Sequence, residues 1–259
     1  MRTTLNIVIL MIIQIGLMSK AWASITKLSV TLPSISITLK YAEPVRLSQI
    51  LFDSQKILHQ KSAYPTFWLA AQLLQKSKNN KLDVLKKEVL EKLDFIIKHD
   101  PDSQVKAQYL SEFIKNSHFN YRHFISLDND FIRITKENDP LLNGDFTLLT
   151  PTRKNKLQII GASPTSMVVN FIENGTIDDY LQDRVIPNNS DNSIFYVIQP
   201  DANVSKVNTA MWHKDPIFFA PEAILFIGFK RLPNDFFQLN NQITELLRSL
   251  SPLSEKGSI

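Results

Sequence analysis

The stretches SITLKYAEPVRLSQIL, residues 36–51, and SMVVNFIENGTIDDYL, residues 166–181, describe one strand-to-helix corner twice in the same chain. In each copy an alternating apolar and polar run is followed by a polar break and then by apolar residues at helical spacing. Tyr41 aligns with Phe171 and Leu47 with Ile177, in both cases 130 residues apart. The repeat predicts that the chain contains a duplicated structural unit.

Alternating segments around each corner predict a β-hairpin in each copy, formed by 25–32 with 35–41 and by 157–160 with 167–171. A further hairpin is expected from 194–199 and 204–207. The run AILFIGF, residues 223–229, is almost unbroken in its apolar character, as is typical of a central strand buried on both faces. These signals predict an α+β fold with two tandem β-grasp-like domains.

A helical block interrupts the first copy. Apolar residues follow helical spacing in the stretches 67–74, 84–97 and 105–113, and strand signals return at 124–127, 131–135 and 145–150. We therefore expect a helical insertion at about 62–118 within a first domain spanning 24–151. The second domain is expected at 152–232, and a C-terminal amphipathic helix at 233–251.

The N-terminus resembles an export signal. Arg2 precedes the apolar run 5–17, and Ala21-Trp22-Ala23 provides a cleavage site, so residues 1–23 predict a signal peptide cut before Ser24. The chain of 259 residues carries a formal net charge of +4 and no cysteine. So small a charge gives no reason to expect a nucleic-acid partner, and a cysteine-free exported chain suits a bacterial periplasm.

The expected C-terminal helix has one apolar stripe. Asn234 is a candidate N-cap. The stripe consists of Phe236, Leu239, Ile243, Leu246, Leu247 and Leu250. So many apolar side chains have to dock on something, which is either their own domain or a partner or membrane surface.

Arginines beside aromatic residues form the candidate binding site. Arg133 alternates with Ile132 and Ile134 in a predicted strand. With Arg122, Arg153, Tyr121 and Trp68 it could bind an acidic sugar in a groove between the first sheet and the inserted helices, through charge-assisted hydrogen bonds and stacking. The alternative is that these arginines are structural and bind loop carbonyls. Trp212 either caps the second domain or offers a sugar platform.

Motifs for catalysis are weak in this chain. Its six glycines form no G-x-G arrangement, and His118 and His123 have a poor spacing for two metal ligands on one helix face. Asp128-Asn129-Asp130 is more typical of a turn with capping carboxylates than of a metal site. We expect no catalytic residues, no metal and no cofactor. A hydrolase with two facing carboxylates remains the alternative, since distant residues can converge.

Three segments carry a resemblance to a known family: SLDNDFIRITKENDPLLNGDFTLLTPTR (126–153), YVIQPDANVSKVNTAMWHKD (196–215) and APEAILFIGF (220–229). They resemble the capsule biosynthesis GfcC family of periplasmic proteins. The resemblance implies tandem β-grasp domains, a helical insertion and a C-terminal amphipathic helix. Two positions depart from the pattern: Ala202-Asn203 follow Pro-Asp where a glycine is usual, and Glu222 replaces a usual glycine.

The function implied by the resemblance is non-enzymatic assistance in capsule or exopolysaccharide assembly or export, in the periplasm. Its expected partners are the polysaccharide or the outer-membrane export machinery. Two alternatives stay open. The protein could be a polysaccharide-modifying enzyme such as a hydrolase, or a purely structural partner of an exporter that never contacts glycan.

Overall fold

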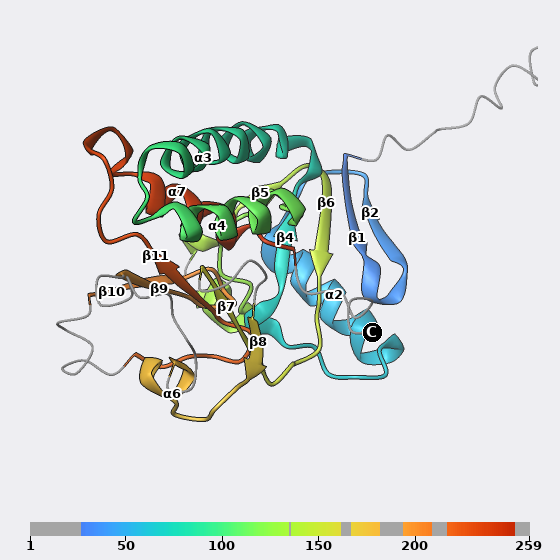
Figure 1. Ribbon diagram of the computed structural model, residues 1–259. Coiled ribbons are helices and arrows are strands. Elements are labelled where there is room, and N and C mark those ends of the chain that lie inside the picture. The colour runs from blue at the N-terminus through green and yellow to red at the C-terminus, as the bar shows by residue number, and fades with distance from the viewer. Residues whose placement is uncertain (1–26, 135, 162–166, 182–193, 209–216, 252–259) are drawn as a thin grey trace, which may run out of the picture.

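The computed structural model describes residues 27–134, 136–161, 167–181, 194–208 and 217–251. Two sheets lie beside each other, and a layer of helices covers the second (Figure 1). Within these ranges, no helix is both long enough and apolar enough to span a bilayer. The predicted signal peptide lies outside the described residues.

The first sheet has the strand order β2-β1-β6-β4. β1 (Leu28–Leu32) pairs antiparallel with β2 (Ile37–Tyr41) and parallel with β6 (Gly144–Leu149), and β4 (Gln72–Leu74) pairs antiparallel with β6 at the far edge. Alternate residues of β1 face a core that α2 (Leu47–Lys61) closes from one side. The opposite face of this sheet carries polar side chains.

The start of α2 is fixed by a residue far away in sequence. The Asp139 carboxylate accepts hydrogen bonds from the Ser48 backbone N–H, at 2.8 Å, and from the Ser48 hydroxyl, at 2.7 Å. A two-stranded sheet of β3 (Val45–Arg46) and β5 (Leu141–Leu142) brings Asp139 to this position. Such a carboxylate satisfies backbone donors that the first helical turn leaves without partners.

The second sheet repeats the topology of the first, with the strand order β10-β9-β11-β7-β8. Its strands are β7 (Lys156–Ile160), β8 (Met167–Asn170), β9 (Ile194–Ile198), β10 (Val204–Asn208) and β11 (Ile224–Gly228). In both sheets the first hairpin strand lies parallel to the last strand, and a helix follows the hairpin, here α6 (Ile177–Leu181). The predicted α+β fold of two tandem β-grasp-like units is confirmed.

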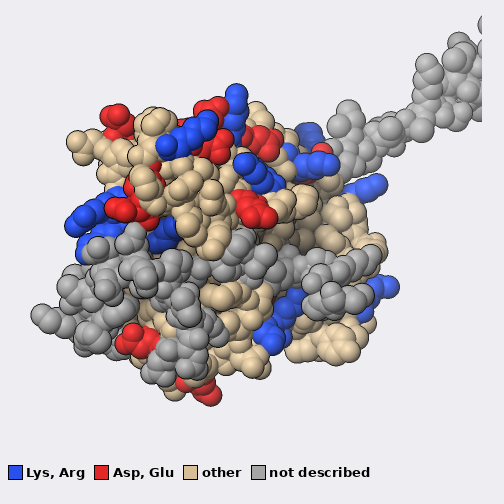
Figure 2. All heavy atoms as spheres, viewed as in Figure 1, with Lys and Arg blue, Asp and Glu red and all other residues tan. Residues whose placement is uncertain are grey.

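Helices from two distant parts of the chain cover one face of the second sheet (Figure 1). They are α3 (Asn80–His99), α4 (Gln104–Asn116) and α7 (Leu239–Arg248). One core combines residues of these helices with Ile160, Tyr196, Ile198 and Phe226 of the sheet. The helices inserted in the first unit therefore pack on the second. Lysine, arginine, aspartate and glutamate are interspersed on their outer surface (Figure 2).

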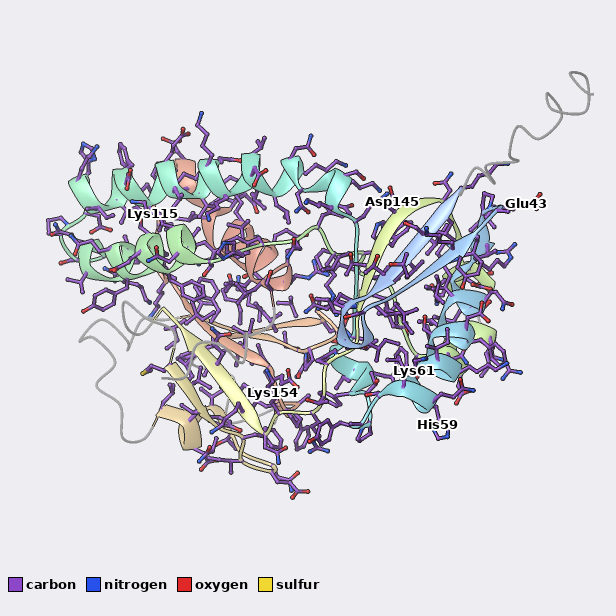
Figure 3. All side chains as sticks on the ribbon, turned by 90° about the vertical axis from the view of Figure 1, so that its right-hand side faces the viewer. Glu43, His59, Lys61, Lys115, Asp145 and Lys154 are labelled. Carbon is purple, nitrogen blue, oxygen red and sulfur yellow. The ribbon has the colours of Figure 1, made fainter. Side chains whose placement is uncertain are left out.

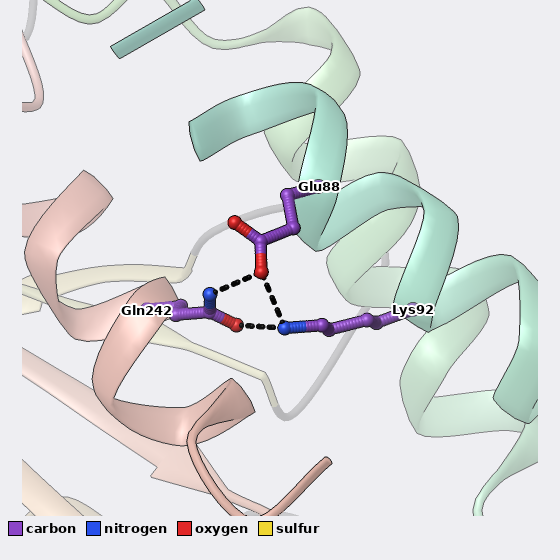
Figure 4. Close-up of polar contacts among 3 residues, drawn as sticks. All are labelled: Glu88, Lys92 and Gln242. Carbon is purple, nitrogen blue, oxygen red and sulfur yellow. Dashed lines mark hydrogen bonds and ion pairs between the residues drawn. The ribbon is translucent and has the colours of Figure 1, made fainter. Parts of the chain in front are cut away.

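The apolar stripe of α7 packs within this core. Leu239, Ile243, Leu246 and Leu247 are buried, and Phe236 and Leu250 pack against them while partly exposed. On the polar side, Lys92 of α3 donates to Glu88 at 2.6 Å and to Gln242 of α7 at 2.8 Å, and Gln242 donates to Glu88 at 2.8 Å (Figure 4). These hydrogen bonds hold the pKa of Glu88 below its usual value.

Three local predictions were wrong. The stretch 67–74, expected as a helix, forms the short 3-10 turn Trp68–Ala70 and strand β4. The expected strand at 124–127 is a loop, and the expected strand at 131–135 is part of helix α5 (Asn129–Ile134) as far as the structure describes it. Within the expected insertion at about 62–118, the α-helices span 80–116. Asn234 is not the N-cap of α7, because it begins the 3-10 turn Asn234–Phe236. Three further 3-10 turns are Pro33–Ile35, Lys76–Lys78 and Lys136–Asn138.

Candidate functional site

A groove of about 810 Å³ lies at the junction of the two units. One wall comes from the first unit, through segments 68–71 and 124–131. The other wall comes from the β9–β10 turn and the end of α7. The side chains that give the groove its chemistry are Gln55, Trp68, Arg122, Phe124, Asp128, Asp130, Phe131, Asp201, Asn203 and Arg248. We call this hollow the junction groove.

Arg122 lies at the base of the junction groove and is only 6% exposed. Its Nη2 donates to the carbonyl of Ala71, at 3.3 Å, and to that of Pro200, at 2.8 Å. Burial lowers the pKa of the guanidinium to about 10, against the opposing effect of the Asp201 charge, so it is still a cation at neutral pH. Arg122 therefore ties a loop of the first unit to the β9–β10 turn of the second.

Arg248 and Phe124 form the second feature of the junction groove. The guanidinium carbon lies 3.8 Å from the centroid of the Phe124 ring, which is 37% exposed. Arg248 also donates through Nε to the Ala202 carbonyl, at 2.9 Å, and through Nη1 to Glu245, at 2.7 Å. The guanidinium thus lies over the Phe124 ring as a cation–π contact on the groove wall.

Carboxylates are the third feature. Asp128 Oδ1 accepts the backbone N–H groups of Asp130, at 2.9 Å, and Phe131, at 3.2 Å, and so caps α5 as the sequence predicted for this turn. Both oxygens of Asp201 accept hydrogen bonds from Asn203. Asp130 is exposed on the groove wall. The groove thus has three carboxylates against two guanidinium groups that already bind protein atoms.

Of the five predicted glycan-binding residues that the structure describes, two, Arg122 and Trp68, line the junction groove. Arg133 is exposed on α5, outside the groove lining, because its segment is a helix and not a strand. Arg153 is exposed near Phe67, with its guanidinium carbon 5.9 Å from the ring centroid. Tyr121 packs on the helix core, with the ammonium groups of Lys78 and Lys81 near its ring. Trp212 lies outside the described residues.

Sequence reasoning did not identify Arg248 as a residue of the site. It also missed the groove walls, since the inserted helices were expected to form one side. The pairing of Arg248 with Phe124 joins two residues far apart in the chain, and no spacing in the sequence signals it.

A smaller cavity, of about 100 Å³, lies between the sheets on the other side of Arg122. Gln72 of β4 and Gln158 of β7, both buried, line it together with Glu222. Burial raises the pKa of Glu222, although its carboxylate accepts the Lys154 N–H at 2.9 Å. Within the described ranges, no three His, Cys, Asp or Glu side chains gather as metal ligands.

Comparison with known proteins gives matches over most of the chain. The family profile "Capsule biosynthesis GfcC, N-terminal" matches residues 24–153, and the profile "Capsule biosynthesis GfcC C-terminal" matches residues 165–252. The chain is also similar to the "Uncharacterized protein YjbG" of Escherichia coli strain K12, with 26% identity over 107 residues. That similarity covers 41% of this chain and 44% of the relative, which is less than half of either protein. From its two profile matches, the chain belongs to the capsule biosynthesis GfcC family.

Proposed function

We propose that this protein is a non-enzymatic accessory factor of capsule or exopolysaccharide assembly, and that it contacts the glycan through the junction groove. Family membership supports the process. The observation that carries the glycan contact is the set of aromatic and planar polar side chains on the same groove walls, with Trp68, Phe124 and Phe131 beside Asn129 and Asp130. Aromatic faces can stack on sugar rings, while carboxylates and amides accept and donate hydrogen bonds to hydroxyl groups.

The charge of the groove favours uncharged sugars over acidic ones. Arg122 and Arg248 each donate to protein carbonyls, and three carboxylates line the same surface. Because the three carboxylates outnumber the two guanidinium groups, a sugar acid would meet an excess of negative charge there, which disfavours binding. Arg133, around which the expectation of acid binding was built, lies outside the groove lining. The part of a polymer that lies in this groove should therefore carry hydroxyl groups and no carboxylate.

The binding test uses oligosaccharides made by partial hydrolysis of the polysaccharide that the source cell produces. Calorimetric titration should detect weak binding, and Phe131→Ala should reduce the affinity about fivefold to tenfold, since about 1.4 kcal/mol corresponds to a factor of ten. Phe131 is 48% exposed, so its replacement should leave the fold intact. Phe237→Ala is the matched control, because Phe237 is 70% exposed and outside the groove lining. Absence of binding, or equal losses in both variants, would refute the glycan contact.

A hydrolase is the second candidate, because Asp128, Asp130 and Asp201 line the same groove. Two of the three already hold local structure: Asp128 caps α5, and Asp201 binds Asn203 through both oxygens. A hydrolase would release new reducing ends from the polysaccharide, and Asp130→Asn would abolish that release. We expect no release above a blank without protein.

The cellular part of the proposal is that residues 1–23 direct the chain to the periplasm, where it serves the polysaccharide or the outer-membrane export machinery. Expression of the full chain in a Gram-negative host should yield a protein that begins at Ser24 and is released by osmotic shock. N-terminal sequencing and fractionation measure both. A product that keeps Met1 and stays with the membranes would contradict the periplasmic assignment.

A further inference from the structure

A second hollow, of about 470 Å³, adjoins the junction groove. It lies between the last turns of α2 and the loop 62–66, and we call it the α2-end hollow. Gln55 and Trp68 line both hollows, so the two meet at these side chains. Figure 3 shows His59, another lining residue, at this end of α2.

The α2-end hollow has the same kind of lining as the junction groove but no carboxylate among its lining residues. Its aromatic surfaces come from Trp68 and from Tyr64, which is 70% exposed. The loop is held in shape by Ser62, whose hydroxyl donates to the Tyr64 carbonyl at 2.7 Å and accepts the Tyr64 N–H at 3.4 Å. The backbone of Tyr64 is therefore held by the Ser62 hydroxyl, while its ring is largely exposed.

We propose that the two hollows form one continuous track for an extended polysaccharide chain, with Trp68 at the point where the chain passes from one to the other. This inference rests on the proposed glycan contact and deepens it, because it specifies a polymer segment as the ligand. Single small-ligand sites range from about 300 to 1,000 Å³, so each hollow alone has the size of a complete site. A ligand confined to one hollow would leave the other empty, whereas a polymer occupies both.

The physical consequence of a shared track is a dependence of affinity on chain length. Once a chain is bound in the junction groove, its next sugars are held at high local concentration beside Tyr64 and His59. The second contact then adds to the affinity without a second loss of translational freedom. Fragments too short to pass Trp68 gain nothing from the α2-end hollow.

The test compares fragments of about three and about eight sugar residues, because only the longer ones should engage both hollows. For the wild-type protein, the longer fragments should bind at least about tenfold more tightly, with Kd measured by calorimetry. Tyr64→Ala should remove most of this gain and leave the affinity for short fragments unchanged. Phe131→Ala, in the junction groove, should weaken both. Phe237→Ala serves again as the control for loss of an exposed ring.

Each result bears on a different claim. Equal affinity for short and long fragments would overturn the track while leaving the glycan contact in the junction groove intact. An equal effect of Tyr64→Ala on both fragment lengths, or no effect on either, would also overturn it. Absence of binding at any length would refute the proposed glycan contact and the track together.

Discussion

The four-strand arrangement of the first sheet recurs in the second, which adds the edge strand β10, but the two sheets differ in how many of their faces are covered. In the first sheet, buried and more exposed residues alternate along β1, and the outward face carries hydroxyl groups. Thr31 and Thr38 are hydrogen bonded there at 3.1 Å, and Ser29 donates to Asp145. In the second sheet, β9 and β11 each have four consecutive buried residues. Helices α3, α4 and α7 cover one face, and α6 with segment 217–223 packs on the other.

The difference shows how a duplicated unit diverges. The outward face of β1 and β2 is open to water in the first unit, whereas the matching face of the second sheet is covered by protein, and part of that protein is the insertion of the first unit. A sheet buried on both faces needs apolar residues at successive positions, whereas one buried on a single face needs them at alternate positions. Because the helix core joins residues from both units, we expect them to unfold as one.

The largest loss of stability is expected from a substitution that places a charge on the covered face of the second sheet. Leu246 is fully buried between α7 and the second sheet, so Leu246→Asp places an unpaired carboxylate in an apolar core. We expect a loss of at least about 3 kcal/mol in the free energy of unfolding, and with it impaired export of the polysaccharide. Urea unfolding gives the first value and cell-surface polysaccharide the second.

The control for this prediction is Thr38→Asp, on the uncovered face of β2, which loses the hydrogen bond to Thr31 and should cost no more than about 1.5 kcal/mol in the free energy of unfolding. If Leu246→Asp had the same urea midpoint as Thr38→Asp, then α7 would not be packed as described, and the contrast between covered and open faces would fail.

A smaller loss of stability is expected where hydrogen bonds connect α7 to the residue that follows β11. Asn240 Nδ2 donates to the Phe229 carbonyl at 2.7 Å, and its Oδ1 accepts the Phe229 N–H at 2.9 Å. Asn240→Ala leaves both buried backbone groups without these partners and should cost about 1–3 kcal/mol in the free energy of unfolding. Asn241→Ala, one position further along the helix, removes an exposed amide. Equal urea midpoints for the two variants would contradict this role for Asn240.

The sequence predicted the repeated parts of the fold well. α2 begins at Leu47 and α6 at Ile177, and β2 begins at Ile37 and β8 at Met167, so the structure keeps the 130-residue offset of the sequence. The apolar run predicted as a central buried strand is β11. These predictions succeeded because periodicity reports which faces of an element are covered.

The predictions for two elements, β4 and α5, were wrong because the polarity pattern was misleading in both. All residues from Ala70 to Leu74 are buried, including the polar Gln72, so polarity along this stretch does not alternate with exposure and does not distinguish a strand from a helix. In α5 the alternation of Ile132, Arg133 and Ile134 imitated a strand, but Ile134 is 85% exposed and the cap by Asp128 selects a short helix. The candidate site was predicted least well, because its walls come from segments that only the tertiary fold brings together.

A pH effect distinguishes the covered sheet from the open one. Lys106 of α4 donates to the Gly228 carbonyl at the end of β11, at 2.8 Å, and burial lowers its pKa to about 8. Between this value and about 10.4, the ordinary lysine pKa, the unfolded state binds more protons than the folded state. The free energy of unfolding should therefore rise with pH above about 8, by up to roughly 1.4 kcal/mol per pH unit.

Urea unfolding between pH 8 and pH 9.5 measures this slope, in a window below the ordinary pKa of tyrosine at about 10. Lys106→Met should flatten the curve, because a neutral side chain has no proton to release. Lys87→Met, on the exposed side of α3, should leave the slope unchanged. A slope that persists in Lys106→Met would assign the effect to another group.

The smallest effect is expected at a turn of the second sheet, where the backbone departs from what side chains prefer. Ala202 and Glu222 have φ values of 71° and 70°, in the left-handed region that favours glycine. Ala202→Gly should relieve about 1–2 kcal/mol of left-handed strain. It should also lose about 0.8 kcal/mol of buried methyl and about 0.5–1 kcal/mol through the freer unfolded chain. The free energy of unfolding should thus stay nearly constant.

The control is Ala223→Gly. Ala223 is equally buried but is not among the described residues with positive φ, so this variant should lose stability through both the buried methyl group and the freer unfolded chain, with no strain to release. Equal destabilisation of the two variants would mean that the turn at Ala202 stores no strain.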